Sequence, residues 1–313
     1  MVVALVAAFA LLNAPPSLER GITIDVTSAG DAMKATDFEQ LYSLGFRTVR
    51  LKFAVSEIAK PSVTEELMET ARAATRASLT VMLSEIKPEG SDDDARALWA
   101  RLANVMGRLG EREVAFAPAP RATIDWVKEL RPGLPRHTIV IEFPTSEDLM
   151  ASPPTQDSNV VLAFRFDEPL AFTHQGIESK NPLTKFLKNL PYPSTPRVVS
   201  PLLFDVANID ARKLLKSFGD ERWNAETLDR RFRTVARWAS ERRARVMCSW
   251  VGASRTFAEP GARNAYLGDT VQALQKNEIP WMLGGYTGPF GIFTGEAGLR
   301  VPDWSVLNLL RKQ

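Results

Sequence analysis

The chain has 313 residues, of which 45% are hydrophobic and 24% charged, enough to bury the core of one large domain. Its 39 Lys and Arg residues against 37 Asp and Glu give a formal net charge of +2, which favours neither a nucleic acid nor an anionic membrane surface as partner. The single cysteine, Cys248, excludes a disulfide within the chain and a thiolate-rich metal centre. Two histidines, His137 and His174, stand on either side of a predicted strand, so we expect no metal and no cofactor.

The N-terminal segment is open to two interpretations. Val2 to Leu12 is an unbroken apolar run with the length of a signal-peptide core, too short to span a bilayer, and Asn13 to Pro16 ends it. No positive residues precede the run, but its length and its abrupt end still favour residues 1–16 as a signal-peptide remnant or N-terminal extension of an exported, periplasmic or extracellular protein. The alternative is a cytoplasmic protein whose apolar segment packs under the folded domain. In both cases we expect that domain to span residues 17–313.

Short β-branched runs alternate with helical patterns along the chain. Near-continuous hydrophobicity of such runs is typical of parallel strands buried on both faces. The predicted strands are Gly21–Val26, Thr48–Phe53, Leu79–Ile86, Glu113–Ala117, Thr138–Phe143, Asn159–Phe166, Arg245–Val251 and Ile279–Leu283.

The intervening segments carry helix start and stop signals. Thr36 and Glu39 have the spacing of a capping box, and Gly45 can end the helix that follows. Ser91, followed by three aspartates, predicts another helix start with a negative first turn. The apolar stripe from Leu228 to Ala239 predicts a further amphipathic helix.

This alternation favours a (β/α)8 TIM barrel of one domain over a doubly wound sheet. The segment from Asp167 to Asn224 is too long and too rich in proline for an ordinary connection. We expect it to form an excursion over the barrel mouth after the sixth strand. Loops of this kind commonly shape a binding cleft.

Several stretches resemble the cellulase-type glycoside hydrolases of family 5. Phe164 to Gly176 reads Phe-Arg-Phe-Asp-Glu-Pro-Leu-Ala-Phe-Thr-His-Gln-Gly, where that family usually opens with His-Phe-Tyr-Glu-Pro. The other similar stretches, in order, are Asp37–Phe53, Leu79–Pro88, Val114–Pro120, Val246–Gly252 and Trp281–Phe293. The resemblance implies a TIM barrel, with Arg50 in the place of the family's active-site arginine.

The same resemblance puts other residues where the family keeps its chemistry. Ala119 stands at the position of the acid/base glutamate, and Trp250 at that of the nucleophile. Neighbouring polar positions also differ, because the family's Asn, His, Tyr and stacking Trp correspond here to Pro118, Arg165, Asp167 and Gly284. A retaining glycosidase needs two carboxyl groups about 5–5.5 Å apart, and neither Ala119 nor Trp250 can supply one.

We therefore expect a catalytically inactive relative that binds a polysaccharide or a protein. The alternative is an active glycosidase that hydrolyses O-glycosyl bonds of a β-glucan or related polysaccharide with relocated carboxylates, drawn from Glu85, Glu142, Asp167 and Glu168. A third hypothesis is a structural or interaction protein whose cleft is closed by Trp250, with the outer helices or the long loop after the sixth strand as its working surface.

The candidate substrate-binding residues are Arg50, Glu85, Glu142, Arg165, Asp167, Trp250 and Tyr286. The two arginines suit an anionic sugar, or instead form ion pairs with Glu142 and Asp167. The two aromatic side chains either stack on a sugar ring or fill the core. We expect His174 to be structural, and Cys248 to be a small buried side chain on the same side of its strand as Trp250.

Overall fold

The computed structural model describes residues 16–27, 31–54, 60–86, 91–110, 112–118 and 122–311. The apolar run Val2–Leu12 and the position Ala119 lie outside these residues.

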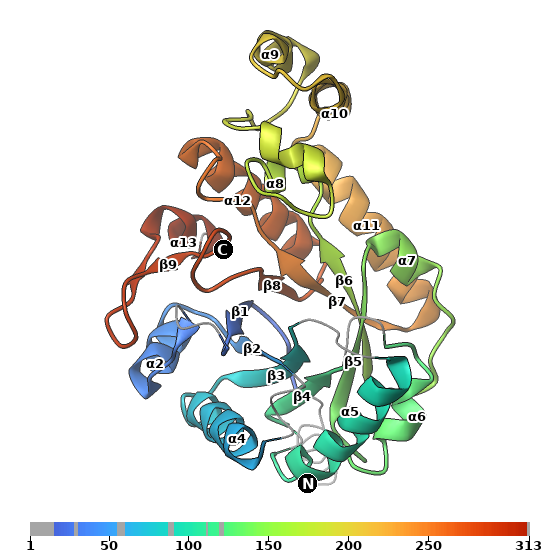
Figure 1. Ribbon diagram of the computed structural model, residues 1–313. Coiled ribbons are helices and arrows are strands. Elements are labelled where there is room, and N and C mark those ends of the chain that lie inside the picture. Colours follow the sequence, from blue (N-terminus) through green and yellow to red (C-terminus); the bar gives the residue numbers. More distant parts are fainter. Residues whose placement is uncertain are drawn as a thin grey trace, which may run out of the picture.

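The centre of the molecule is a closed barrel of eight parallel strands, each paired with its neighbours in chain order (Figure 1). The strands are β1 (Gly21–Asp25), β2 (Thr48–Phe53), β3 (Thr80–Glu85), β4 (Val114–Ala117), β5 (Thr138–Phe143), β6 (Val160–Phe166), β7 (Arg245–Val251) and β8 (Trp281–Leu283). All eight were predicted, and they differ from the prediction only at their ends. The (β/α)8 TIM barrel is confirmed.

Helices cover the outside of the barrel (Figure 1). They are α2 (Ala35–Ser43), α4 (Pro61–Arg76), α5 (Asp92–Met106), α6 (Trp126–Leu130), α7 (Ser146–Met150), α11 (Ala225–Arg242), α12 (Pro260–Lys276) and α13 (Trp304–Arg311). After β8 the chain also forms a small antiparallel pair, β9 (Phe293–Thr294) with β10 (Val301–Pro302).

Two of the predicted helix starts had different outcomes. Ser91 caps α5 as expected, because its hydroxyl accepts a hydrogen bond from the Asp94 backbone N–H. The box predicted from Thr36 and Glu39 is wrong. Helix α2 begins two residues earlier than this box requires, so Lys34 is its N-cap and the Lys34 N–H donates to the Asp37 carboxylate at 2.8 Å.

The excursion after β6 contains α8 (Leu170–Thr173), α9 (Pro196–Val199), α10 (Ile209–Asp220) and the 3-10 turns η2 (Pro182–Phe186) and η3 (Ser200–Phe204). Helices α9 and α10 stand away from the barrel at the top of the view (Figure 1). The expectation that the whole segment lies over the mouth is therefore wrong for these two helices. Only the first part of the segment, through α8 and the following His174, stays beside the strand ends, where His174 contacts Trp250.

Alternation along the strands separates two cores. One set of buried side chains packs between strands and helices, while a smaller set fills the barrel interior: Leu18, Met82, Ala115, Ala117, Val140, Val161, Ala163, Met247 and Met282. On β2, the outward residues Val49, Leu51 and Phe53 belong to the first set. Arg50 and Lys52 lie between them in sequence and therefore face the interior.

A register shift in β7 breaks this alternation near the strand's end. Phe164 pairs with Cys248 but Arg165 pairs with Trp250, so β7 has an extra residue there. Ser249 and Trp250 both reach the interior side, where they contact Glu142 and Arg165. Cys248 is fully buried in the outer core. It is the small buried side chain we expected, but the bulge places it on the opposite side from Trp250.

Candidate functional site at the barrel mouth

A buried ion pair occupies the centre of the mouth. Arg50 donates from both terminal nitrogens to the two carboxylate oxygens of Glu142, at 2.8 and 3.0 Å. The same guanidinium donates to the Ser84 hydroxyl at 2.7 Å and to the Ser249 carbonyl at 3.2 Å, and the Ser249 hydroxyl donates to Glu142. These side chains come from β2, β3, β5 and β7, so the pair ties opposite sides of the barrel together.

The surroundings of Glu142 keep it ionised. Burial alone would raise its pKa, but the charge and hydrogen bonds of Arg50, followed by Arg165 and Ser249, lower the pKa to about 2. A carboxylic acid that donates a proton near pH 7 needs a raised pKa instead. Glu142 therefore lacks the property required of a general acid, and both of its oxygens already have partners.

Trp250 closes the mouth on the β7 side. Its ring is 6% exposed and is surrounded by His174, Phe290 and Arg165, at centroid distances of 5.7, 5.2 and 5.0 Å. A Cβ atom at position 284 would lie 2.4 Å from the indole, so the ring fits only because Gly284 has no side chain. Trp250 and Gly284 are thus complementary, because the indole occupies the space that a side chain at position 284 would need.

Sequence reasoning missed Lys52, which faces the mouth two residues after Arg50. Lys52 and Arg165 are both partly exposed, and the side chain of neither makes a hydrogen bond or ion pair with another residue of the described parts of the chain. Burial, followed by the charge of Arg50, lowers the pKa of Lys52 to about 8. Period-two alternation from Arg50 was the signal that could have identified it.

The structure does not bring the remaining carboxylates together as an acid and base pair. Glu85 is on the outward face of β3 and accepts a hydrogen bond from the Trp99 indole of α5 at 3.2 Å. Glu168 pairs with Arg231 of α11 at 2.6 Å. The prediction that Glu85 lies in the mouth is therefore wrong. Its neighbour Ser84 takes the inward position on the strand.

Asp167 lies at the end of β6 with 8% exposure, and its carboxylate is 3.8 Å from the Lys180 ammonium. The Asp167 carbonyl accepts a hydrogen bond from Thr173, whose hydroxyl is 2.9 Å from Nδ1 of His174. Burial lowers the pKa of His174 to about 4. The imidazole is therefore neutral near pH 7, stacked on Trp250 and held by its loop, which agrees with the structural role expected of it.

Tyr286 does not offer a stacking face in this structure. Its side chain is fully buried, with the Phe293 ring at 4.6 Å and the Arg300 guanidinium 5.4 Å from its centroid. A ring without exposed surface cannot stack on a sugar. Of the seven candidate binding residues, Arg50, Glu142, Arg165 and Trp250 meet at the mouth, and Asp167 lies beside them.

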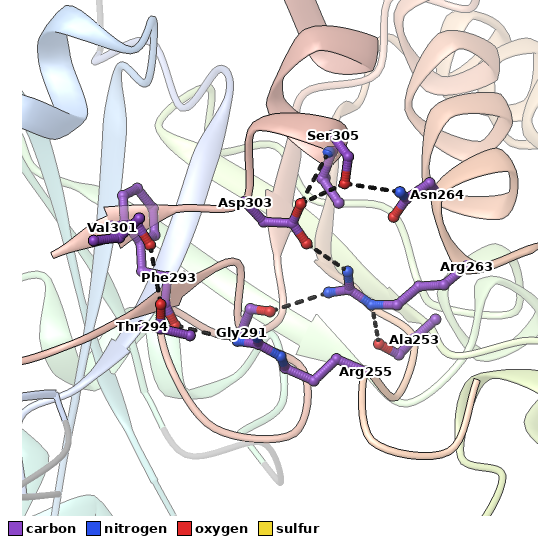
Figure 2. Close-up of polar contacts among 11 residues, drawn as sticks. Ala253, Arg255, Arg263, Asn264, Gly291, Phe293, Thr294, Val301, Asp303 and Ser305 are labelled. Carbon is purple, nitrogen blue, oxygen red and sulfur yellow. Dashed lines mark hydrogen bonds and ion pairs between the residues drawn. The ribbon is translucent and has the colours of Figure 1, made fainter. Parts of the chain in front are cut away.

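A buried arginine, Arg263, links the loops that follow β7 and β8 (Figure 2). Arg263 of α12 donates to the carbonyls of Ala253, after β7, and Gly291, after β8, at 3.1 and 3.0 Å. Its remaining terminal nitrogen is 3.3 Å from Asp303. The loop that ends with Phe290 is thereby held against the strand that carries Trp250.

A cavity of about 870 Å³ adjoins the mouth. It shares Glu142 with the mouth and continues past the half-buried ring of Phe143, between α6 and the segment 152–157. Its volume is within the usual range for a ligand site.

Other kinds of site have less support in the described parts of the chain. No group of three or more His, Cys, Asp or Glu residues is placed to hold a metal ion. None of the described helices has the length and apolar character needed to cross a bilayer.

Comparison with solved structures finds the same fold in a cellulose synthase subunit and in endoglucanases. Clostridial cellulose synthase subunit Z (CcsZ) from Clostridioides difficile is 18% identical, with a TM-score of 0.75 over 95% of this chain and 100% of that one. An endoglucanase is 15% identical, with a TM-score of 0.74 over 95% and 97%. Cel5A of Thermotoga maritima, solved with cellobiose, is 17% identical, with a TM-score of 0.71 over 94% and 97%.

No family model matches the sequence, and no curated protein matches it. At these identities the similarity establishes the fold. The chain is a (β/α)8 barrel of the kind found in cellulases and endoglucanases.

Proposed function

We propose that this protein binds a polysaccharide without cleaving it, as a catalytically inactive protein with the barrel of the family 5 glycoside hydrolases. The observation that carries the proposal is which side chains occupy the barrel mouth. Arg50 engages both oxygens of Glu142, and Trp250 fills the space at the end of β7, where the sequence resemblance would put that family's nucleophile.

Hydrolysis with retention needs one carboxylate free to attack and one carboxylic acid ready to donate a proton. Glu142 is ionised and fully engaged, and Asp167 lies beside Lys180. Glu85 and Glu168 face the helices. This arrangement favours the inactive protein over the alternative with relocated carboxylates.

The case for a saccharide rests on the cavity beside the mouth and on the neighbours in fold. A cavity that includes a half-buried aromatic ring, Phe143, suits a sugar, which presents apolar C–H groups to such a ring. The neighbours include endoglucanases and a cellulose synthase subunit, so a β-glucan is the first polysaccharide to test. Export, which the run Val2–Leu12 favours, would place the protein where such polymers occur.

One observation supports a protein partner as the second candidate. The excursion presents the apolar side chains of Phe204 and Ile209, which are 89% and 68% exposed. An exposed apolar surface of this kind is a common feature of protein contacts. In that case the excursion, rather than the mouth, would be the working surface.

Titration calorimetry with cellotetraose tests the proposal. We expect saturable binding with a Kd between about 1 μM and 1 mM, equivalent to roughly 4–8 kcal/mol, and recovery of the tetrasaccharide intact. Phe143→Ala should weaken binding about tenfold or more, whereas Phe186→Ala, a matched aromatic truncation on the excursion, should not. Absence of binding, or equal effects of the two variants, would contradict a saccharide site beside the mouth.

A further inference from the structure

We infer that the barrel mouth recognises a carboxylate-bearing saccharide, a uronate, through Lys52 and Arg165. This inference rests on the proposed function and adds the chemical class of its ligand.

The inward-facing charges of the mouth do not balance. Beside Lys52 and Arg165 stand Arg50 and three carboxylates: Glu142, Asp167 and Asp25, the last being the cross-strand partner of Lys52 on β1. Glu142 is occupied by Arg50, and Asp167 is 3.8 Å from the Lys180 ammonium. One oxygen of Asp25 accepts hydrogen bonds from the N–H and hydroxyl of Thr27 at 3.0 and 2.7 Å. Two cations therefore remain at the mouth without an ion pair to any described residue.

Arg165 is held in a suitable orientation by Trp250. Its guanidinium lies over the indole, 5.0 Å from the ring centroid, and its Nε is buried with no hydrogen-bond partner among the described residues. Stacking fixes the plane of the group and leaves its edge to bind an acceptor. A carboxylate matches that edge, because its two oxygens have the spacing of the guanidinium nitrogens.

Lys52 supplies a second positive charge from β2, across the closed barrel from Arg165 on β6, and the two charges are near enough to interact. Burial and the nearby arginines, Arg50 and Arg165, disfavour its protonated form, while Glu142 and Asp25 favour it only in part. A bound carboxylate would favour the protonated form of Lys52 and would supply the counter-charge that Arg165 lacks among the described residues. A neutral sugar hydroxyl would not, because it brings no charge into the partly desolvated mouth.

Two probes that differ only at C6 test the inference: a β-1,4-linked tetramer of glucuronate, and cellotetraose. Hydrogen bonds to a charged group contribute about 1.5–3 kcal/mol, so we expect the uronate to bind about 10- to 100-fold more tightly. Lys52→Met and Arg165→Gln should each remove most of this preference. Lys52→Arg should keep it, and Lys213→Met, which deletes an exposed cation of α10, should leave it unchanged.

The outcomes separate this inference from the proposed function. Equal or tighter binding of cellotetraose overturns the inference and leaves saccharide binding in place. Binding of neither probe overturns both. A uronate preference that survives in folded Lys52→Met and Arg165→Gln, or that falls in Lys213→Met, places the carboxylate elsewhere and overturns the inference.

Discussion

Replacement of Glu142 by glutamine is expected to lower the free energy of unfolding by about 3–5 kcal/mol, because it leaves a buried arginine without its counter-charge. The two side chains are only 3% and 4% exposed, and their bidentate contact joins β2 to β5. Chemical denaturation of the variant and the parent measures the difference.

Two further variants make this result specific. Glu129→Gln removes the carboxylate of an exposed pair, whose side chains Arg96 and Glu129 are 33% and 46% exposed, and should cost less than about 1 kcal/mol. Arg50→Met combined with Glu142→Met removes both charges and should recover most of the loss. If Glu142→Gln were as mild as Glu129→Gln, the ion pair would not be the central constraint of the mouth.

The same pair predicts how stability depends on pH. The folded-state pKa of Glu142 is about 2, below its ordinary value of 4.5, so the unfolded chain takes up the proton first as pH falls. The contribution of this group is complete above about pH 4.5 and is lost progressively towards pH 2. Denaturation of the parent between pH 5 and 2 should include this loss, and Glu142→Gln should lack it.

Trp250→Ala is expected to destabilise the protein by about 3–5 kcal/mol, the usual effect of deleting a buried aromatic side chain. The ring is enclosed by His174, Phe290 and Arg165, so its removal leaves a cavity at the mouth. Thermal unfolding measures the loss. An unchanged melting temperature would show that the ring is not a structural closure of the mouth.

A double-mutant cycle with Gly284 tests how Trp250 is accommodated. In the parent, Gly284→Ala puts a methyl group 2.4 Å from the indole and should cost about 1–3 kcal/mol. In the Trp250→Ala background the same methyl group meets no ring, so the cost should largely disappear. Additive effects of the two substitutions would contradict the complementarity of Trp250 and Gly284.

The local sequence pattern was sufficient to predict the strands of the barrel. Most positions of each barrel strand are buried, so the largely apolar, β-branched pattern located runs such as Thr48–Phe53 and Arg245–Val251 with correct bounds. The identity of inward residues also follows from alternation. That rule places Ser84 inside and Glu85 outside, and its application to β3 would have removed Glu85 from the candidate site.

The rest of the site depends on contacts that alternation cannot predict. The bulge in β7 turns Trp250 inward beside Ser249, and only the pairing with β6 shows it. The partner of Arg50 is on β5, 92 residues away, and nothing local distinguishes Glu142 from the other carboxylates. Tyr286 looked like a binding aromatic because it follows β8, but the loop that continues to Phe293 covers it.

The central claim, a cellulase-type barrel that does not hydrolyse, is tested most directly by turnover of an aryl β-cellobioside with an activated leaving group. Such a substrate reduces the need for a proton donor, so it reveals any remaining nucleophile. We expect release of the aryl group to be indistinguishable from the uncatalysed rate over hours. Turnover on the order of 1 per second, abolished by replacement of Glu142 or Asp167, would contradict the claim and establish relocated carboxylates.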